Sequence, residues 1–257
     1  MIELKRVCAG YGGRDVIHDV SFRFETGVNY CLLGPNGCGK TTLLRAMSGL
    51  IPHTGEVLLD GARLETLPRR KIAAKIAVMS QINTIYFPYT VYDTVMLGRY
   101  QHMKRGPFGG VSARDREAVE RCLASTGLSD LRNRLVSELS GGQCQRVFLA
   151  HTLAQEPDAI LLDEPTNYLD IRHQVELIDY LKDWTSDGKH SVVGVFHDVN
   201  LALRLTDRAL FMKDGRLLGS GRFGEVAGRA FLTELFGMDI AGYMIESLQK
   251  WEALARW

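Results

Sequence analysis

Short apolar runs alternate with segments of helical spacing along most of this 257-residue chain. Compact apolar runs of strand length lie at residues 30–33, 159–162 and 191–196. Apolar residues recur every three to four positions over 41–50, 112–126, 175–184 and 200–205, which predicts helices there. Strands that alternate with helices favour an α/β fold, with a largely parallel sheet covered on both faces.

Two parts of the chain depart from this alternation, one near the start and one in the middle. Near the start, two strand-like segments, 2–7 and 16–24, are separated only by the glycine-rich turn 10–13. The middle section is polar and helical, and its amphipathic helix begins at a plausible Ser112 cap. We therefore expect one domain over 1–257, with a core of about 1–82 and 156–257 and a helical insertion of about 83–155.

The C-terminal segment predicts a hairpin followed by a helix. The tripeptide DGR at 214–216 is typical of a turn between two short strands. Met244, Leu248, Trp251 and Ala255 fall on one face of a helix. We expect this helix to pack onto the core, and a dimer contact is the alternative.

Composition and charge exclude several classes of protein. Apolar residues make up 46% and charged residues 24%, as in ordinary globular proteins, and 31 basic against 30 acidic residues leave a charge of +1. This balanced charge therefore gives no indication of nucleic-acid binding. No apolar run approaches the length of a membrane span, and the N-terminus lacks the apolar stretch of a secretion signal. The five scattered cysteines form no CxxC pair, which favours free thiols.

The segment 34–42, which reads GPNGCGKTT, matches the phosphate-binding pattern GxxxxGK[ST] in full. Its glycines let backbone amides curl inward, and those amides and the following helix N-terminus bind anionic phosphates. Lys40 supplies a cation near the β- and γ-phosphates, and the Thr41 hydroxyl can ligate Mg²⁺. The predicted ATP-binding residues of this phosphate loop are Gly34, Pro35, Asn36, Gly37, Cys38, Gly39, Lys40, Thr41 and Thr42.

Cys38 lies inside the phosphate loop, beside its amides and close to Lys40. That electropositive setting predicts a lowered thiol pKa and a reactive thiol, if the site is open. Alkylation of Cys38 would then inactivate the protein.

The segment 159–164, AILLDE, supplies two carboxylates at the end of a buried-type strand. Adjacent side chains on a strand point in opposite directions, so the two acids cannot share one role. We expect Asp163 to orient Mg²⁺ and Glu164 to act on the water that attacks the γ-phosphate, as general base or water-positioning group.

The pentapeptide LSGGQ at 139–143 resembles the signature of ATP-binding-cassette (ABC) ATPases. The resemblance covers nearly the whole chain and implies the P-loop ABC ATPase fold: a mostly parallel core sheet, an N-terminal antiparallel β subdomain and a helical subdomain. It also implies a head-to-tail dimer of two copies, because the signature closes the ATP site of the facing subunit. The signature residues implied to contact that ATP are Ser140, Gly141, Gly142 and Gln143.

Three further residues match the family's pattern, and two depart from it. The resemblance implies that Tyr11 stacks on adenine, that Gln81 contacts Mg²⁺, and that His197 contacts the γ-phosphate with a catalytic role beside Lys40, Gln81 and Glu164. It also implies that the segment 167–170 crosses the dimer interface. Cys144 and His151 stand where relatives usually carry longer polar or basic residues, and their consequence is left open.

Four segments are similar to the ATPases of importers for iron–siderophore, haem and cobalamin complexes: 86–91 (YFPYTV), 95–99 (VMLGR) with His102, 169–174 (LDIRHQ) and 197–202 (HDVNLA). Those importers pair two ATPases with two membrane-spanning permease subunits and an extracytoplasmic substrate-binding protein. The resemblance therefore implies a peripheral position on the cytoplasmic face of the inner membrane. Molybdate-type relatives share the pattern, so the sequence does not name the cargo.

Two other classes of function compete with an importer ATPase. One is a soluble ABC ATPase without a transport role. Translation-type members carry two cassettes in one chain and repair-type members carry a long coiled coil, whereas this sequence has one cassette and no such coiled coil. The other is a degenerate cassette that acts as a scaffold. The presence of Lys40, Gln81, Glu164 and His197 argues against the scaffold.

Overall fold

The computed structural model describes residues 1–79, 88–103, 110–167 and 169–255. Six strands form the main sheet in the order β10-β9-β3-β8-β7-β6. Neighbouring strands from β6 to β9 are parallel, and β10 is antiparallel to β9. The strands are β3 (Tyr30–Leu33), β6 (Ile76–Met79), β7 (Ala159–Asp163), β8 (Ser191–Val195), β9 (Arg208–Lys213) and β10 (Arg216–Arg222).

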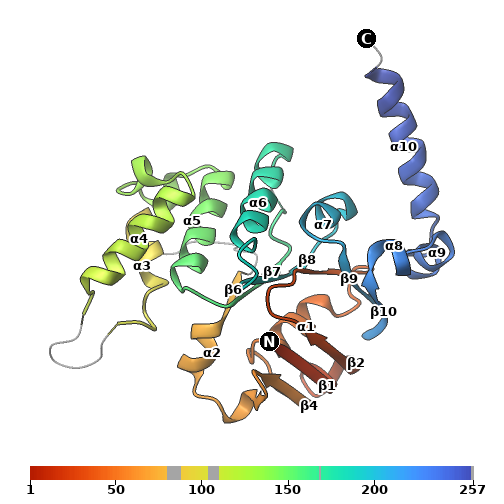
Figure 1. Cartoon of the computed structure of the whole chain (residues 1–257), viewed down its shortest axis with the longest axis horizontal. Coiled ribbons are helices and arrows are strands. Elements are labelled where there is room, and N and C mark those ends of the chain that lie inside the picture. Colours follow the sequence, from red (N-terminus) through yellow and green to blue (C-terminus); the bar gives the residue numbers. More distant parts are fainter. Residues whose placement is uncertain (80–87, 104–109, 168, 256–257) are drawn as a thin grey trace.

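Each face of the main sheet is covered by a different layer (Figure 1). Alternate residues of a strand enter opposite clusters: Leu32 of β3 and Leu161 of β7 pack toward the N-terminal sheet, whereas Leu33 and Leu162 pack toward the helices. Burial on both faces explains why these strands are continuous apolar runs. The flanking helices are α1 (Lys40–Met47), α5 (Gly141–Ala154), α6 (Ile171–Trp184), α7 (Val199–Leu205) and α9 (Arg229–Phe236).

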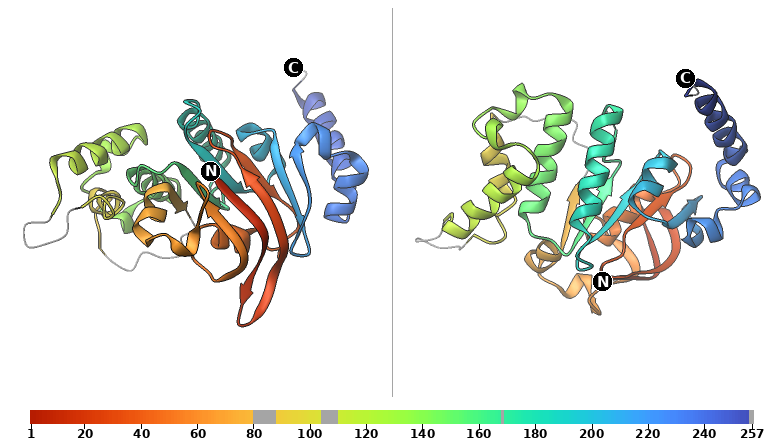
Figure 2. Two further views of the ribbon diagram at one scale, coloured as in Figure 1. Left: turned by 60° about the horizontal axis from the view of Figure 1, so that its bottom comes forward. Right: turned by 45° about the horizontal axis from the view of Figure 1, so that its top comes forward.

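A second, antiparallel sheet of order β2-β1-β4-β5 lies beyond α1 (Figure 2, left). It contains β1 (Ile2–Tyr11), β2 (Arg14–Phe24), β4 (His53–Leu59) and β5 (Ala62–Arg63). The turn between β4 and β5 places Asp60 and Gly61 at φ 51° and 83°. Such an Asp-Gly pair is a strong hairpin signal, and it identifies two strands that the apolar pattern did not predict.

Three helices of the middle section have a hydrophobic cluster of their own, which includes Val91, Val119 and Val147. They are α3 (Val91–Leu97), α4 (Ala113–Ser125) and α5. Ser112 caps α4, and Asp115 completes a capping box, as the sequence indicated for that helix start. Helix α5 also packs on the main sheet through Leu149 and thereby joins the helical section to the core.

A buried arginine holds the base of the helical section. Arg99 is 1% exposed, its Nε donates to Asp115 Oδ1 at 3.1 Å, and its Nη1 donates to the Ala154 carbonyl at 2.7 Å. The same Nη1 lies 3.0 Å from Glu156 Oε2. A buried cation needs such partners, so Arg99 ties α3, α4 and the end of α5 together.

The C-terminal hairpin forms as predicted, but the packing predicted for the C-terminal helix is wrong. Helix α10 (Ile240–Leu254) has no buried residue, and its Leu248 and Trp251 are 62% and 70% exposed. It stands away from the body of the molecule in Figure 1. The apolar face is present, yet no other described element covers it, because the chain leaves the core at the preceding turn.

The remaining elements are short. They are α2 (Arg69–Lys75), α8 (Phe223–Val226) and the 3₁₀ turns η1 (Leu64–Thr66), η2 (Ser129–Leu131) and η3 (Val136–Glu138). Among the described residues, every helix is too short or too polar to cross a membrane.

Candidate active site

The phosphate loop connects β3 to α1 and needs glycine at two crowded positions. Gly34 has a φ of 151°, and a Cβ there would lie 2.1 Å from the Met212 carbonyl oxygen. Gly39 has a φ of 100°, and a Cβ there would lie 2.7 Å from Ile17 Cγ2. Both positions therefore combine a backbone that side chains disfavour with direct steric exclusion. At these two positions the loop can therefore bring its backbone close to an anion.

Lys40, the first residue of α1, folds back over the loop. Its side chain is buried at 5% exposure, and its Nζ donates to the carbonyl oxygens of Gly34 at 2.7 Å and Pro35 at 2.8 Å. The two carbonyls satisfy the hydrogen-bonding needs of the buried ammonium. Thr42, two residues further along α1, is buried as well.

Cys38 contradicts the lowered pKa that the sequence predicted. Burial raises the pKa of the Cys38 thiol above its ordinary value, and the nearby Lys40 cation offsets this only in part. The Sγ lies 3.9 Å from Lys40 Nζ, and the residue is 5% exposed. The sequence showed the cation but not the burial, and burial is the larger effect.

Asp163, the last residue of β7, faces the start of α1. The Thr41 hydroxyl donates to Asp163 Oδ1 at 2.8 Å, and Asp163 is 9% exposed. Burial raises the pKa of the Asp163 carboxyl, and the hydrogen bond from Thr41 opposes that rise. Two oxygen donors this close, at a poorly solvated position, suit a hard cation such as Mg²⁺.

Glu164 turns toward a different set of partners. Its φ of 54° is left-handed, which is uncommon outside glycine and redirects the chain directly after the strand. Glu164 Oε1 lies 2.6 Å from His197 Nε2, and Oε2 accepts from Asn167 Nδ2 at 2.5 Å. The adjacent acids Asp163 and Glu164 are thus held in separate environments. His197 follows β8, and Asn167 lies in the loop after β7.

Tyr11 lies at the exposed end of β1, beside the turn at Gly12 and Gly13. Its ring is 46% exposed, and its hydroxyl accepts from Arg45 Nη1 at 3.1 Å. An exposed aromatic ring held through its hydroxyl can present a face to a planar base. Arg45 was not among the residues that the sequence indicated as part of the site, because its contact with Tyr11 is evident only in three dimensions.

The segment 140–143 forms the start of α5. Ser140 Oγ accepts from the Gln143 backbone N–H at 3.3 Å, and Gln143 Oε1 accepts from the Ser140 N–H at 3.0 Å, which makes a capping box. Ser140 and Gly141 are exposed. Between described residues, no hydrogen bond or ion pair joins this segment to the phosphate loop. Gln81 and Tyr168 lie outside the described residues.

Two contacts tie α5 to the residues that follow β7. Gln145 Nε2 donates to the carbonyl of Pro165, directly after Glu164, at 2.6 Å. The His173 ring packs against Gly142, where a Cβ would lie 3.0 Å from its Cδ2. His173 Nδ1 in turn lies 2.8 Å from Asp170 Oδ1, the N-cap of α6. No local sequence pattern predicts the Gln145 contact.

Cys144 and His151 have structural roles on α5. His151 Nδ1 contacts the Thr94 carbonyl at 2.9 Å, and burial lowers the pKa of His151. The neutral ring therefore donates from Nδ1 and ties α5 to α3. The Cys144 Sγ lies 3.5 Å from the Val136 carbonyl, and burial raises the pKa of this thiol.

Comparisons with known proteins agree with this architecture. The family profile described as "ABC transporter" matches residues 17–167. The Bacillus subtilis (strain 168) protein described as "Probable siderophore transport system ATP-binding protein YusV" is 39% identical over 239 residues, covering 93% of this chain and 86% of its own length. The hemin import ATP-binding protein HmuV of Jannaschia sp. (strain CCS1) is 36% identical over 245 residues, covering 92% and 87%.

A solved structure with the same fold is a dimer. The dimeric structure of MJ0796, a bacterial ABC transporter cassette, has a TM-score of 0.74 and 31% identity. The match covers 86% of this chain and 98% of that cassette. The likeness therefore extends over the main sheet, the antiparallel sheet and the helical section together.

Proposed function

This chain belongs to the ABC transporter family as an ATP-binding subunit that hydrolyses ATP, and from that premise we propose that it powers the import of a metal chelate. The cargo class proposed is an iron–siderophore, haem or cobalamin complex. One observation carries the proposal: relatives described as siderophore and hemin ATP-binding proteins match over nearly their whole lengths and nearly the whole of this chain.

The phosphate loop is proposed to bind the ATP phosphates. Backbone amides of 34–42 and the N-terminus of α1 favour anions, and Lys40 would exchange its two carbonyl partners for phosphate oxygens. Tyr11 would stack on adenine. Thr41 and Asp163 would hold Mg²⁺, together with Gln81, and the cation would neutralise charge on the phosphates when bound.

Glu164 is proposed to take the proton of the attacking water. Its carboxylate is held from two sides, by His197 at Oε1 and Asn167 at Oε2, which fixes its orientation. Positioning of this kind speeds hydrolysis, because the base and the attacking water must be aligned before the proton is transferred. His197 lies beside Glu164 and is therefore proposed to contact the γ-phosphate in the same site.

Two copies are proposed to close over two ATP molecules, head to tail. The exposed start of α5, with Ser140, Gly141, Gly142 and Gln143, would contact the ATP held by the other copy through its helix amides. We further propose two permease subunits, received by the helical section of about 83–155 against a core of about 1–82 and 156–257. The assembly would sit on the cytoplasmic face of the inner membrane and serve an extracytoplasmic binding protein.

Reconstitution tests this function directly. The tagged chain is co-expressed with permease genes found beside its own gene, purified in detergent and placed in proteoliposomes with ATP inside. Uptake of a ferric siderophore, haem, cobalamin and molybdate is then measured in parallel, with Lys40→Ala as the matched control. We expect ATP-dependent uptake of one metal chelate. Uptake of molybdate alone would contradict the cargo class, and failure of the chain to co-purify with any permease subunit would favour a soluble, non-transport ATPase.

A further inference from the structure

A cavity of about 310 Å³ separates α5 from α6, away from the phosphate loop. The two helices lie side by side in Figure 1 and in the right-hand view of Figure 2. The cavity walls are mostly apolar and include Leu149, Leu169, Leu177 and the ring of Tyr180. A space of this size with apolar walls and few polar groups is typical of a small-molecule site.

Arg146 of α5 supplies an unsatisfied cation to this cavity. Its Nε is buried and has no hydrogen-bond partner among the described residues. Its Nη1 makes only a long 3.5 Å contact with the Thr126 carbonyl. Arg146 is partly buried, and its guanidinium has no carboxylate partner among the described residues. An anion with two oxygens is the partner that matches the geometry of this group.

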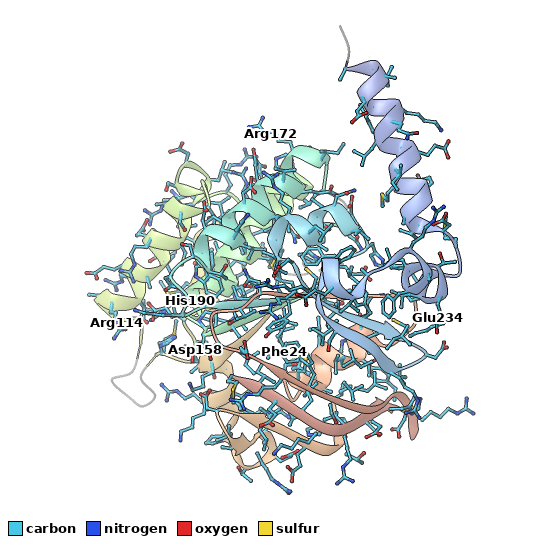
Figure 3. All side chains as sticks on the ribbon, turned by 45° about the vertical axis from the view of Figure 1, so that its right-hand side comes forward. Phe24, Arg114, Asp158, Arg172, His190 and Glu234 are labelled. Atoms are coloured by element: carbon cyan, nitrogen blue, oxygen red, sulfur yellow. The ribbon has the colours of Figure 1, made fainter. Side chains whose placement is uncertain are left out.

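The other charged groups on the wall already have partners. Glu176 accepts from Arg172 Nε at 2.8 Å, and Arg172 points outward on the exposed side of α6 (Figure 3). His173 is paired with Asp170 at 2.8 Å. Glu176 is close enough to feel the Arg146 charge, but no ion pair between the described residues joins them. Arg146 is therefore the charged group of the cavity wall that has no ion-pair partner among the described residues.

We propose that this cavity binds a small aromatic or branched aliphatic carboxylate, with its carboxylate on Arg146 and its apolar body between Leu149 and Leu177. The size of the cavity, about ten times the share of one water in the liquid, permits such a ligand. The apolar walls disfavour free phosphate, which has no apolar body to bury.

Gly142 and His173 also line the cavity, so a ligand there reaches the back of the 140–143 segment. The ring of His173 already packs closely on Gly142. A bound carboxylate would hold α5 and α6 apart and restrict the movement of that segment. This regulatory part of the inference depends on the proposed role of 140–143 at the facing subunit's ATP.

Calorimetric titration of the full-length protein with 3-phenylpropionate tests the site. We expect binding on the order of 1 mM, as for other ligands this small. The neutral analogue 3-phenylpropanol has the same apolar body and should bind about 10-fold more weakly, because it makes no charged hydrogen bond. Arg146→Gln should weaken the carboxylate about 10-fold and leave the alcohol unchanged. Methyl NMR should show ligand shifts at Leu149 and Leu177.

Two variants locate the ligand and guard against misfolding. Ser125→Trp, at the exposed mouth of the cavity, should block both ligands without altering Arg146. Lys40→Ala should leave carboxylate binding intact. Absence of binding, equal affinity for the alcohol, or loss of binding in Lys40→Ala with retention in Arg146→Gln would overturn the proposal, the last by placing the ligand in the phosphate loop.

ATP turnover gives a separate reading. Saturating 3-phenylpropionate should lower the turnover of the wild type severalfold and leave Ser125→Trp unaffected. Unchanged wild-type turnover at saturation would overturn the regulatory part alone. A wild type that binds the carboxylate but shows no ATP turnover would contradict the proposed function and leave the cavity site in place.

Discussion

A single buried lysine supplies the positive side chain of the phosphate loop. Lys40 keeps its ammonium on two backbone carbonyls inside a loop whose Gly34 and Gly39 admit no side chain. The charge, the loop shape and the helix start therefore act on the same small volume. Their joint effect on ATP phosphates should exceed that of an exposed lysine, because water screens it less.

Lys40→Ala removes this charge without enlarging any side chain. We expect ATP affinity to fall about 10-fold or more and steady-state turnover to fall about 100-fold or more, since charge-assisted contacts to several phosphate oxygens are lost. Fluorescent-nucleotide titration and phosphate release measure the two effects. Lys71→Ala, which removes an exposed lysine from α2, should change neither. Turnover of Lys40→Ala within a few-fold of the wild type would exclude the proposed role of the loop.

Cys38 should be slow to alkylate despite its electropositive neighbours. Burial raises the pKa of its thiol, so near pH 7 the reactive thiolate is scarce and the Sγ is shielded. Timed iodoacetamide labelling, followed by peptide mass spectrometry, should show modification of Cys38 slower than that of glutathione at pH 7. The rate should rise as the pH passes 9. Complete labelling within the time that glutathione needs would mean that the loop opens readily in solution.

At the scale of elements, α5 connects three parts of the molecule. It packs on α3 and α4 through one apolar cluster, on the main sheet through another, and on the loop after β7 through Gln145. Gly98 permits the close approach of α3, because a Cβ there would lie 2.3 Å from the His151 carbonyl. The contact between α3 and α5 is therefore fixed by a glycine and a neutral histidine.

His151 should make this contact sensitive to acid. Burial lowers its pKa in the folded protein, whereas the unfolded chain takes up a proton as the pH falls through about 6.5. Protonation then favours unfolding, so stability is lost as the pH falls below about 6.5. His151→Asn should cost about 1 kcal/mol at pH 7.5, through the altered hydrogen bond to Thr94, and should show a smaller loss between pH 7.5 and 5.5. Urea denaturation measures both, and equal pH dependence in the two proteins would rule out this role.

At the scale of the whole molecule, the phosphate loop and the start of α5 are two separate parts of the proposed ATP site. One part of the site is assembled within this copy, by Lys40, Thr41, Asp163 and Glu164. The start of α5, by contrast, is exposed, and within the described chain it has no hydrogen bond to these four residues. In the proposed head-to-tail dimer, the start of α5 from a second copy would complete the site.

Glu164→Gln should reveal that arrangement by slowing hydrolysis while keeping ATP bound. Removal of a positioned base typically costs about 10²–10⁴ in rate, so the closed dimer should accumulate with Mg-ATP and the protein should be mostly monomeric without nucleotide. Light scattering with bound-nucleotide analysis should give two copies and two ATP molecules. Adding Ser140→Arg should prevent dimerisation without stopping ATP binding. A Glu164→Gln protein that binds ATP and stays monomeric at every concentration would indicate that the permease subunits are needed for closure.

The parts of the molecule that the sequence predicted well are those set by local backbone chemistry. The phosphate loop must have glycine where its turns occur, and the buried strand 159–162 must be apolar on both faces, so both appear as short patterns. The order of the elements also follows, because alternating strands and helices leave few topologies. The hairpin at Asp60 and Gly61 carried a usable signal that the apolar pattern alone did not include.

The parts that the sequence did not predict depend on contacts between distant residues. The burial of Cys38, the hydrogen bond from Arg45 to Tyr11 and the pairing of Glu164 with His197 join segments that no local pattern relates. Helix α10 shows the same limit: a periodic apolar face identifies the helix but not the surface that covers it.

The hydrogen bond from Gln145 to the carbonyl of Pro165 has a consequence for kinetics. It links the helix offered to the neighbouring copy with the backbone beside this copy's own Glu164. In a head-to-tail dimer, binding of the first ATP between the two copies would thus displace the backbone next to Glu164 in each copy. The second ATP would then bind to a dimer that has already rearranged. If the rearranged pair binds the second ATP more tightly, this linkage gives a sigmoidal dependence of turnover on ATP concentration, instead of the hyperbola of two independent enzymes.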